Sequence, residues 1–171
     1  PSVQAFESDR ATSGWHTRTR VEFTVDDDGL LAMFREGTHE TVALGQMPLA
    51  VREIDELDLF QGAWRSQLRP GDRVRAVMPS GSDPVLMVDR QALWAPGFAA
   101  HPYVREDVVV EGQLYAYRVH AGGFWQIHRE AGAQLISLVR KAAQVREGDA
   151  VVELYSGAGL LTQPLAIATG E

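Results

Sequence analysis

The segment from Val151 to Thr162, which reads Val-Val-Glu-Leu-Tyr-Ser-Gly-Ala-Gly-Leu-Leu-Thr, most constrains how this chain can fold. An apolar run leads into an acidic residue, then a Gly-x-Gly turn, then the apolar start of a helix. This order is typical of the first strand-to-helix turn of a Rossmann-like sheet, where glycines let the backbone approach a ligand because no Cβ intervenes. Only 12 residues follow Gly159, whereas a doubly wound sheet needs further strand–helix units. We therefore expect the chain to be the front part of a longer enzyme.

Composition narrows the class of protein. The 171 residues are 45% hydrophobic and 23% charged, as in a soluble globular protein, and no run reaches the roughly 18 apolar residues of a membrane span. The absence of cysteine excludes disulfides, thiolate metal sites and a thiol nucleophile within the chain, and a cytoplasmic location is the expectation. The formal net charge of −7 argues against binding nucleic acid through overall charge but is compatible with a local basic face. We predict no membrane partner and no metal site.

Strand and turn signals dominate the first two thirds of the chain. Polar and apolar residues alternate over 18–25, Asp26–Gly29 is a turn signal, and 30–35 can form the returning strand of a hairpin. Pro48 opens a helical pattern that reaches about Leu68. Further strands are expected over 38–44, 74–78, 85–88, 108–110 and 114–119, with an irregular connection over 93–103. This pattern predicts an α+β domain with a mainly antiparallel sheet.

The pattern changes after Gly122-Gly123. Apolar residues recur on one face over 127–145, which predicts an amphipathic helix, and the strand of the opening motif is expected over 150–155. We therefore place a domain boundary near Gly122, with a central domain over 1–121 and the start of the Rossmann-like domain over 122–171.

Two segments carry residues suited to binding. Phe124 and Trp125 have flat faces that either stack on a nucleobase or fill a core, and Gln126 can both donate and accept hydrogen bonds. Glu153 could hydrogen-bond the loop or a cofactor amino group, or it could shape the turn without a ligand. Tyr155 could pack on a ligand or cover the helix, and Ser156 could donate a hydrogen bond.

A third group of residues lies near the start of the chain. Arg10, His16, Arg18 and Arg20 are close in sequence, with few acids beside them. They form either the solvated edge of a strand or a strip that contacts phosphates.

The order Phe-x-Gln, amphipathic helix, Leu-Tyr-Ser-Gly-x-Gly, apolar helix resembles that of the RNA uracil-5-methyltransferases, which make 5-methyluridine in tRNA and 23S rRNA. Upstream, 14–21 looks like the family's Gly-Tyr-Arg-x-(Lys/Arg) strand, and 29–42 looks like its following hairpin. The resemblance covers essentially the whole chain. It implies a central α+β domain with possible RNA contact, followed by the start of a Rossmann-like methyltransferase domain that depends on S-adenosylmethionine.

The resemblance also implies a mechanism. In the family a cysteine thiolate adds to carbon 6 of a flipped-out uracil, carbon 5 takes the methyl group, and a glutamate base removes the carbon-5 proton. Both residues lie beyond the glycine turn in the family, so we expect no catalytic residue in this chain and no activity from it alone. Carried over by position, the cofactor contacts are Gln126, Tyr155, Ser156, Gly157 and Gly159. The expected RNA contacts are Phe124, beside the target base, with Arg18, Arg20 and His39.

Three departures from the family pattern qualify these expectations. Leu160 stands where the family often has Asn, which removes a polar contact to the cofactor, and Ser156 stands where it often has Cys. One cysteine of the family's iron–sulfur cluster falls near Met47, and without cysteines this chain holds no cluster. RNA, either tRNA or rRNA, is the expected partner, and DNA is not. The alternatives are a non-catalytic RNA-binding module on the same scaffold and a methyltransferase for protein or small molecules.

Overall fold

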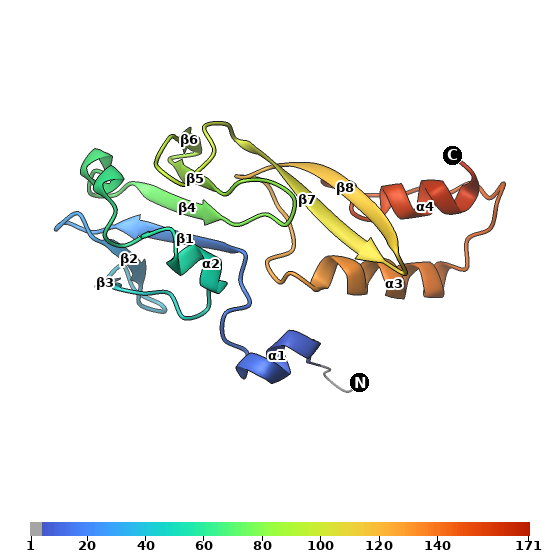
Figure 1. The fold of residues 1–171 in the computed structure, drawn as a ribbon, viewed down its shortest axis with the longest axis horizontal. Helices are drawn as coiled ribbons and strands as arrows, with labels where there is room; N and C mark the ends of the chain where they lie inside the picture. Colours follow the sequence, from blue (N-terminus) through green and yellow to red (C-terminus); the bar gives the residue numbers. More distant parts are fainter. Residues whose placement is uncertain (1–4) are drawn as a thin grey trace.

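Two antiparallel sheets organise the part of the chain that the structure describes (Figure 1). The computed structural model describes residues 5–171, so the first four residues of the predicted central domain lie outside it. The larger sheet has the strand order β3-β2-β1-β4-β5-β6, and β7 and β8 form a separate hairpin. The strands are β1 (Arg20–Val25), β2 (Leu31–Phe34), β3 (Thr41–Ala43), β4 (Arg73–Val77), β5 (Val85–Val88), β6 (Gln91–Leu93), β7 (Tyr103–Val110) and β8 (Gln113–His120). The helices are α1 (Glu7–Thr12), α2 (Arg52–Asp55), the 3₁₀ helix η1 (Ala63–Gln67), α3 (Ala131–Ala143) and α4 (Thr162–Thr169).

The predicted α+β class with a mainly antiparallel sheet is confirmed, and alternation in β1 explains how the sheet is oriented. Val21, Phe23 and Val25 are buried in the main core, while the residues between them point to the opposite face. In the register with β4, Glu22 lies opposite Arg75. One face of β1 and β4 is therefore apolar and packed, and the other carries charged side chains.

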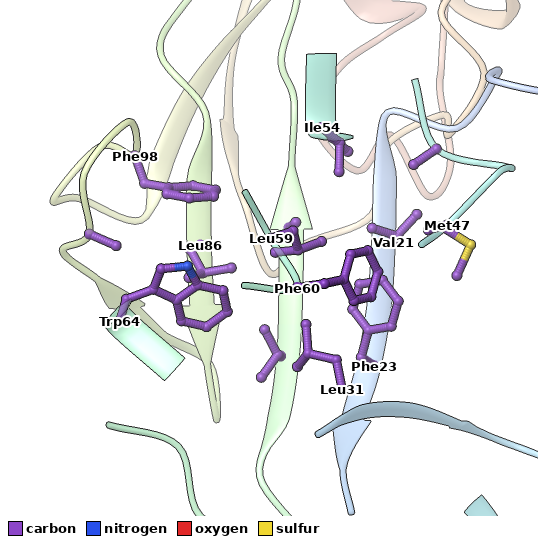
Figure 2. Packing of buried hydrophobic residues seen from close by; sticks show 14 of the residues in the cluster. Val21, Phe23, Leu31, Met47, Ile54, Leu59, Phe60, Trp64, Leu86 and Phe98 are labelled. Carbon is purple, nitrogen blue, oxygen red and sulfur yellow. The ribbon is translucent and has the colours of Figure 1, made fainter. Parts of the chain in front are cut away.

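The main core lies between the six-stranded sheet and the connection that crosses it (Figure 2). Ile54 from α2 and Trp64 from η1 both pack onto the sheet, with exposed fractions of 1% and 5%. The prediction of one helix from Pro48 to about Leu68 is wrong, because two short helices replace it. Asp58 adopts a φ of +53°, and the Trp64 indole occupies the space that a Cβ at Gly62 would fill. The backbone turns at these positions so that apolar residues from both halves reach the sheet.

A second core joins the two sheets to α3. It combines Val77, Val85 and Met87 from the six-stranded sheet with the inner faces of β7 and β8, and Ile136 of α3 is fully buried in it. Figure 1 shows α3 lying along the hairpin and α4 beyond it, at the end of the molecule away from the six-stranded sheet. The predicted amphipathic helix is confirmed over a shorter span, since the residues before Ala131 run as an irregular segment from the end of β8.

The predicted strand over 150–155 is wrong for this structure, which has no strand there. Its apolar residues are exposed, with Val152 at 86% and Leu154 at 77%. A parallel strand forms only when neighbours satisfy its backbone donors and acceptors. Within residues 5–171 the parallel pairing found is an isolated bridge between Arg18 and Ala50, so no Rossmann-like sheet is present in the described part. The helix expected after the glycine turn is present as α4.

Candidate functional site

A cleft of about 510 Å³ lies where the segment after β8 passes the start of β1. It combines aromatic, aliphatic and charged side chains from parts of the chain that are about a hundred residues apart. The lining residues are Arg18, Arg20, Val21, Glu22, Met33, Met47, Leu49, Arg75, Gly122, Gly123, Phe124, Trp125 and Ile127. Two hydrogen bonds fix this approach, because the Ile127 carbonyl accepts from the Thr19 N–H at 2.8 Å and from the Thr19 hydroxyl at 3.0 Å.

The two adjacent aromatic residues of the cleft have opposite roles. Trp125 is 8% exposed and packs against Tyr117, with ring centroids 5.1 Å apart. Phe124 is 78% exposed at the cleft. Trp125 therefore fills the core. Phe124 presents an exposed aromatic face of the kind on which a nucleobase can stack.

A buried ion pair holds Arg20 in the wall of the cleft. Arg20 Nη2 donates to Glu106 Oε1 at 2.7 Å, and both side chains are 6% exposed. Glu106 Oε2 accepts hydrogen bonds from the backbone N–H and the hydroxyl of Ser80. Burial lowers the pKa of the Arg20 guanidinium, and the neighbouring Glu106 opposes this effect. The Nε and Nη1 atoms of Arg20 are buried without a hydrogen-bond partner among the described residues, so the guanidinium is only partly satisfied within the protein.

A second charged group crosses from β1 to β4. Glu22 accepts hydrogen bonds from Nε and Nη2 of Arg75 at 3.0 Å and 2.7 Å, and it also pairs with Arg73. Burial alone would raise the pKa of Glu22, but hydrogen bonds from Arg75 and Arg73 outweigh it and hold the pKa below its usual range. Sequence reasoning did not identify Arg73 or Arg75. Their alternation in Arg-Val-Arg-Ala-Val places both on one face of a strand, which is the signal that could have found them.

The other predicted RNA-contact residues are only partly brought together. Arg18 is exposed and lines the cleft together with Arg20 and Phe124. His39 is exposed in the turn between β2 and β3 and is not among the lining residues. His16 instead places Nδ1 3.1 Å from the Ala50 carbonyl, and Arg10 lies on α1, so the basic residues near the start do not form one strip.

The predicted cofactor residues lie in two places. Gln126 is half-buried in the segment beside the cleft, although it is not among the lining residues. Tyr155 is fully exposed with a φ of +60°, Ser156 is exposed, and Gly157 and Gly159 adopt φ values of +57° and +80°. Ser156 lines a separate hollow of about 420 Å³ between the glycine segment and α4. No hollow described in this structure is lined by both groups.

Glu153 shapes the glycine segment in this structure. Its Oε2 accepts a hydrogen bond of 2.6 Å from the hydroxyl of Thr162, the first residue of α4. The Gly159 N–H donates to the Ser156 carbonyl at 2.9 Å and closes the turn. The positive φ angles at both glycines are ones that side chains rarely adopt, so the loop needs these residues for its backbone.

Tyr117 ties the glycine segment to the hairpin. Its hydroxyl donates to the Leu160 carbonyl at 2.9 Å. Burial, with a smaller contribution from Tyr115, raises the pKa of Tyr117 to about 12, so the hydroxyl remains a donor at ordinary pH. We expect Tyr117→Phe to cost about 0.5–1.5 kcal/mol of unfolding free energy and to speed amide hydrogen exchange over 156–163. Tyr103→Phe is the matched control, and unchanged exchange in Tyr117→Phe would show that the hydroxyl does not hold the loop.

Comparison with known proteins shows which proteins this chain resembles in sequence. No protein-family model matches the chain. An RNA methyltransferase of Bifidobacterium longum is 35% identical over 179 residues, which cover 99% of this chain and 41% of that protein. A tRNA/tmRNA (uracil-C(5))-methyltransferase of Pseudomonas aeruginosa is 29% identical, with 97% of this chain and 54% of that protein covered. The chain is homologous to the RNA (uracil-C5) methyltransferases.

The solved structure of a more distant protein shows the same fold. The Pyrococcus abyssi tRNA (uracil-54, C5)-methyltransferase, in complex with S-adenosyl-L-homocysteine, matches 90% of this chain and 47% of its own, with a TM-score of 0.56 and 17% identity. The chain spans about half the length of its relatives, between 41% and 54% for those named above. Within residues 5–171 no helix is long and apolar enough to cross a membrane, and no three His, Asp or Glu side chains are placed to hold a metal ion.

Proposed function

We propose that this chain is part of a cytoplasmic methyltransferase that uses S-adenosylmethionine to methylate carbon 5 of a uridine in tRNA or rRNA. The observation that carries the proposal is the similarity to RNA methyltransferases over 97–99% of the chain. The geometry of the cleft also supports the proposal, because Phe124, Arg18 and Arg20 all line it. Stacking and phosphate binding are the two interactions that an RNA nucleotide needs there.

Within this proposal the cleft receives the target nucleotide. Phe124 would stack on the uracil, because its ring is exposed at the cleft while Trp125 behind it is held in the core. Arg18 would contact the sugar–phosphate backbone, and Arg20 is held in place by Glu106. His39, on the β2–β3 turn, would contact RNA outside the cleft.

The proposed cofactor residues are Gln126, Tyr155, Ser156, Gly157 and Gly159. The donor set fits S-adenosylmethionine in kind, since an amide and a hydroxyl can bind its amino acid end and a tyrosine ring can cover its adenine. The two glycines have positive φ angles and carry no Cβ, so a ligand can approach the backbone of the loop closely. When bound, the cofactor supplies the methyl group. We also propose that 1–121 is the central domain and that 122–171 begins the Rossmann-like methyltransferase domain.

Deletion of the gene that encodes this chain tests the function. Mass spectrometry of nucleosides from purified tRNA and rRNA should show loss of one 5-methyluridine in the deletion strain, restored by the whole gene. Unchanged 5-methyluridine in both RNA classes would exclude the RNA assignment and leave a methyltransferase for another substrate. Normal methylation on restoring a gene variant with its nucleophilic cysteine replaced would instead favour a non-catalytic RNA-binding module.

A further inference from the structure

A second hollow adjoins the cleft on the charged face of the six-stranded sheet. This hollow of about 320 Å³ shares Glu22, Arg75 and Gly122 with the cleft. Its other lining residues are Arg73, Met87, Asp89 and Arg90. The two hollows lie side by side because they share three lining residues, and we call the pair the basic trough, which extends from Phe124 across β1 and β4 to the turn between β5 and β6.

Strand register places the arginines of the basic trough in a row. On β4, Arg75 lies opposite Glu22 and Arg73 lies opposite Thr24, so both side chains leave the same face of the sheet. At the far end, Asp89 and Arg90 form the two-residue connection between β5 and β6, with φ angles of +45° and +71°. The Asp89 carboxylate accepts a hydrogen bond from the Arg73 N–H at 3.0 Å, which fastens this turn to the end of β4.

The local charge of the basic trough is positive although the chain as a whole carries −7. Its arginines are Arg18, Arg20, Arg73, Arg75 and Arg90. The carboxylates that contact or accompany them are Glu22, Asp89 and Glu106. Five cations against three anions leave an excess of two positive charges along one path.

The paired arginines retain donors for a ligand. Glu22 engages Nε and Nη2 of Arg75 and one nitrogen of Arg73, whereas each guanidinium has five N–H groups. The Arg73 side chain is 73% exposed and that of Arg75 is 31% exposed, so both are accessible from solvent. The shared carboxylate thus holds two guanidinium groups side by side, an arrangement that suits phosphate oxygens.

We propose that the basic trough binds the sugar–phosphate backbone of the nucleotides next to the uridine at Phe124. This inference rests on the proposed function, because the RNA strand has to leave the cleft in some direction. The row of arginines from Arg75 through Arg73 to Arg90 gives the strand a path on which successive phosphates meet a cation. The contacts are to the backbone, so they position RNA without reading its sequence.

Salt-dependent binding by the whole protein tests the proposal. The probe is a fluorescent single-stranded RNA that contains uridine, measured by anisotropy over a range of KCl concentrations. The double variant Arg73→Ala/Arg90→Ala should bind about tenfold more weakly at low salt. The slope of log K against log salt should fall by about 0.7 for each phosphate contact that is lost. The matched control is Arg69→Ala/Arg146→Ala, which removes two exposed arginines that lie outside both hollows and should leave affinity and slope unchanged.

Three outcomes would overturn the inference or its basis. If the wild type binds RNA and Arg73→Ala/Arg90→Ala binds with the same affinity and slope, the trough holds no phosphates. If poly-glutamate of matched charge displaces the RNA as well as unlabelled RNA does, the trough is a site for acidic protein segments instead. If the wild type binds no RNA at any salt concentration, the proposed function itself fails. This result differs from the first outcome, in which the wild type binds RNA and the variant binds it equally well.

Discussion

Replacing Glu106 by leucine should lower the free energy of unfolding by about 3–5 kcal/mol, because it leaves the buried Arg20 guanidinium without its counter-charge. The two side chains are each 6% exposed, so solvent cannot replace the lost partner. Arg20 already has two buried nitrogens without a hydrogen-bond partner among the described residues, so the loss falls on a group that is only partly satisfied. Urea unfolding followed by far-ultraviolet circular dichroism measures the change.

Two further variants separate this effect from the loss of any polar contact. The double variant Arg20→Met/Glu106→Leu replaces both charges with apolar groups of similar size and should recover most of the stability. Glu40→Ala removes one partner of the exposed Arg35–Glu40 pair, whose side chains are 60% and 62% exposed, and should cost at most about 1 kcal/mol. A loss below about 1 kcal/mol in Glu106→Leu would mean that water or movement of the chain compensates the charge of Arg20.

The antiparallel hairpins were predictable because each depends on local alternation and a short turn. Asp26–Gly29 connects β1 and β2, as expected, with the Gly29 N–H bonded to the Asp26 carbonyl. The helical pattern from Pro48 to about Leu68 predicted one helix where there are two short ones, because apolar spacing alone cannot show where the backbone turns. The break lies at Asp58, which has a φ of +53°, and Trp64 after it packs against the sheet.

The contacts within the site could not be predicted from the sequence, because they join residues that are far apart in it. Glu22 meets Arg75 across 53 residues, and Arg20 meets Glu106 across 86. Such pairs follow from the register between strands, which the alternation within each strand does not determine. The local pattern also could not distinguish Phe124 from Trp125, because adjacent residues in an irregular segment have no fixed period. Of the residues expected from the sequence to contact RNA, Phe124, Arg18 and Arg20 line the cleft, whereas the arginines of the adjoining hollow were not expected.

The glycine segment shows the opposite case, in which the structure matches only the second half of a local motif. The motif predicts a strand because its residues favour one, yet 150–155 has no neighbouring strand in the described chain and lies exposed. The turn itself and the helix after it depend on the two glycines and on the Glu153–Thr162 hydrogen bond, which are local. Local interactions are thus sufficient for the glycine turn and α4, whereas a strand over 150–155 requires neighbouring strands.

Phe124→Ala should weaken binding of uridine-containing RNA to the whole protein by about 1–3 kcal/mol, or roughly 5- to 150-fold in Kd, if the ring stacks on the base. The side chain is 78% exposed, so its removal leaves the core intact and the unfolding midpoint should not change. Anisotropy with the same fluorescent RNA measures the affinity. Trp94→Ala removes another exposed aromatic, 68% exposed and outside the cleft, and should bind RNA normally.

An RNA that lacks the target base isolates the stacking contribution. Wild type and Phe124→Ala should bind this abasic RNA with equal affinity, because the ring then has no base to contact, whereas they should differ on the intact RNA. A conservative Phe124→Tyr variant keeps an aromatic face and should restore most of the affinity for intact RNA. If Phe124→Ala weakened binding of both RNAs alike, the ring would act by shaping the segment between β8 and α3, and the uridine would have to bind elsewhere in the cleft.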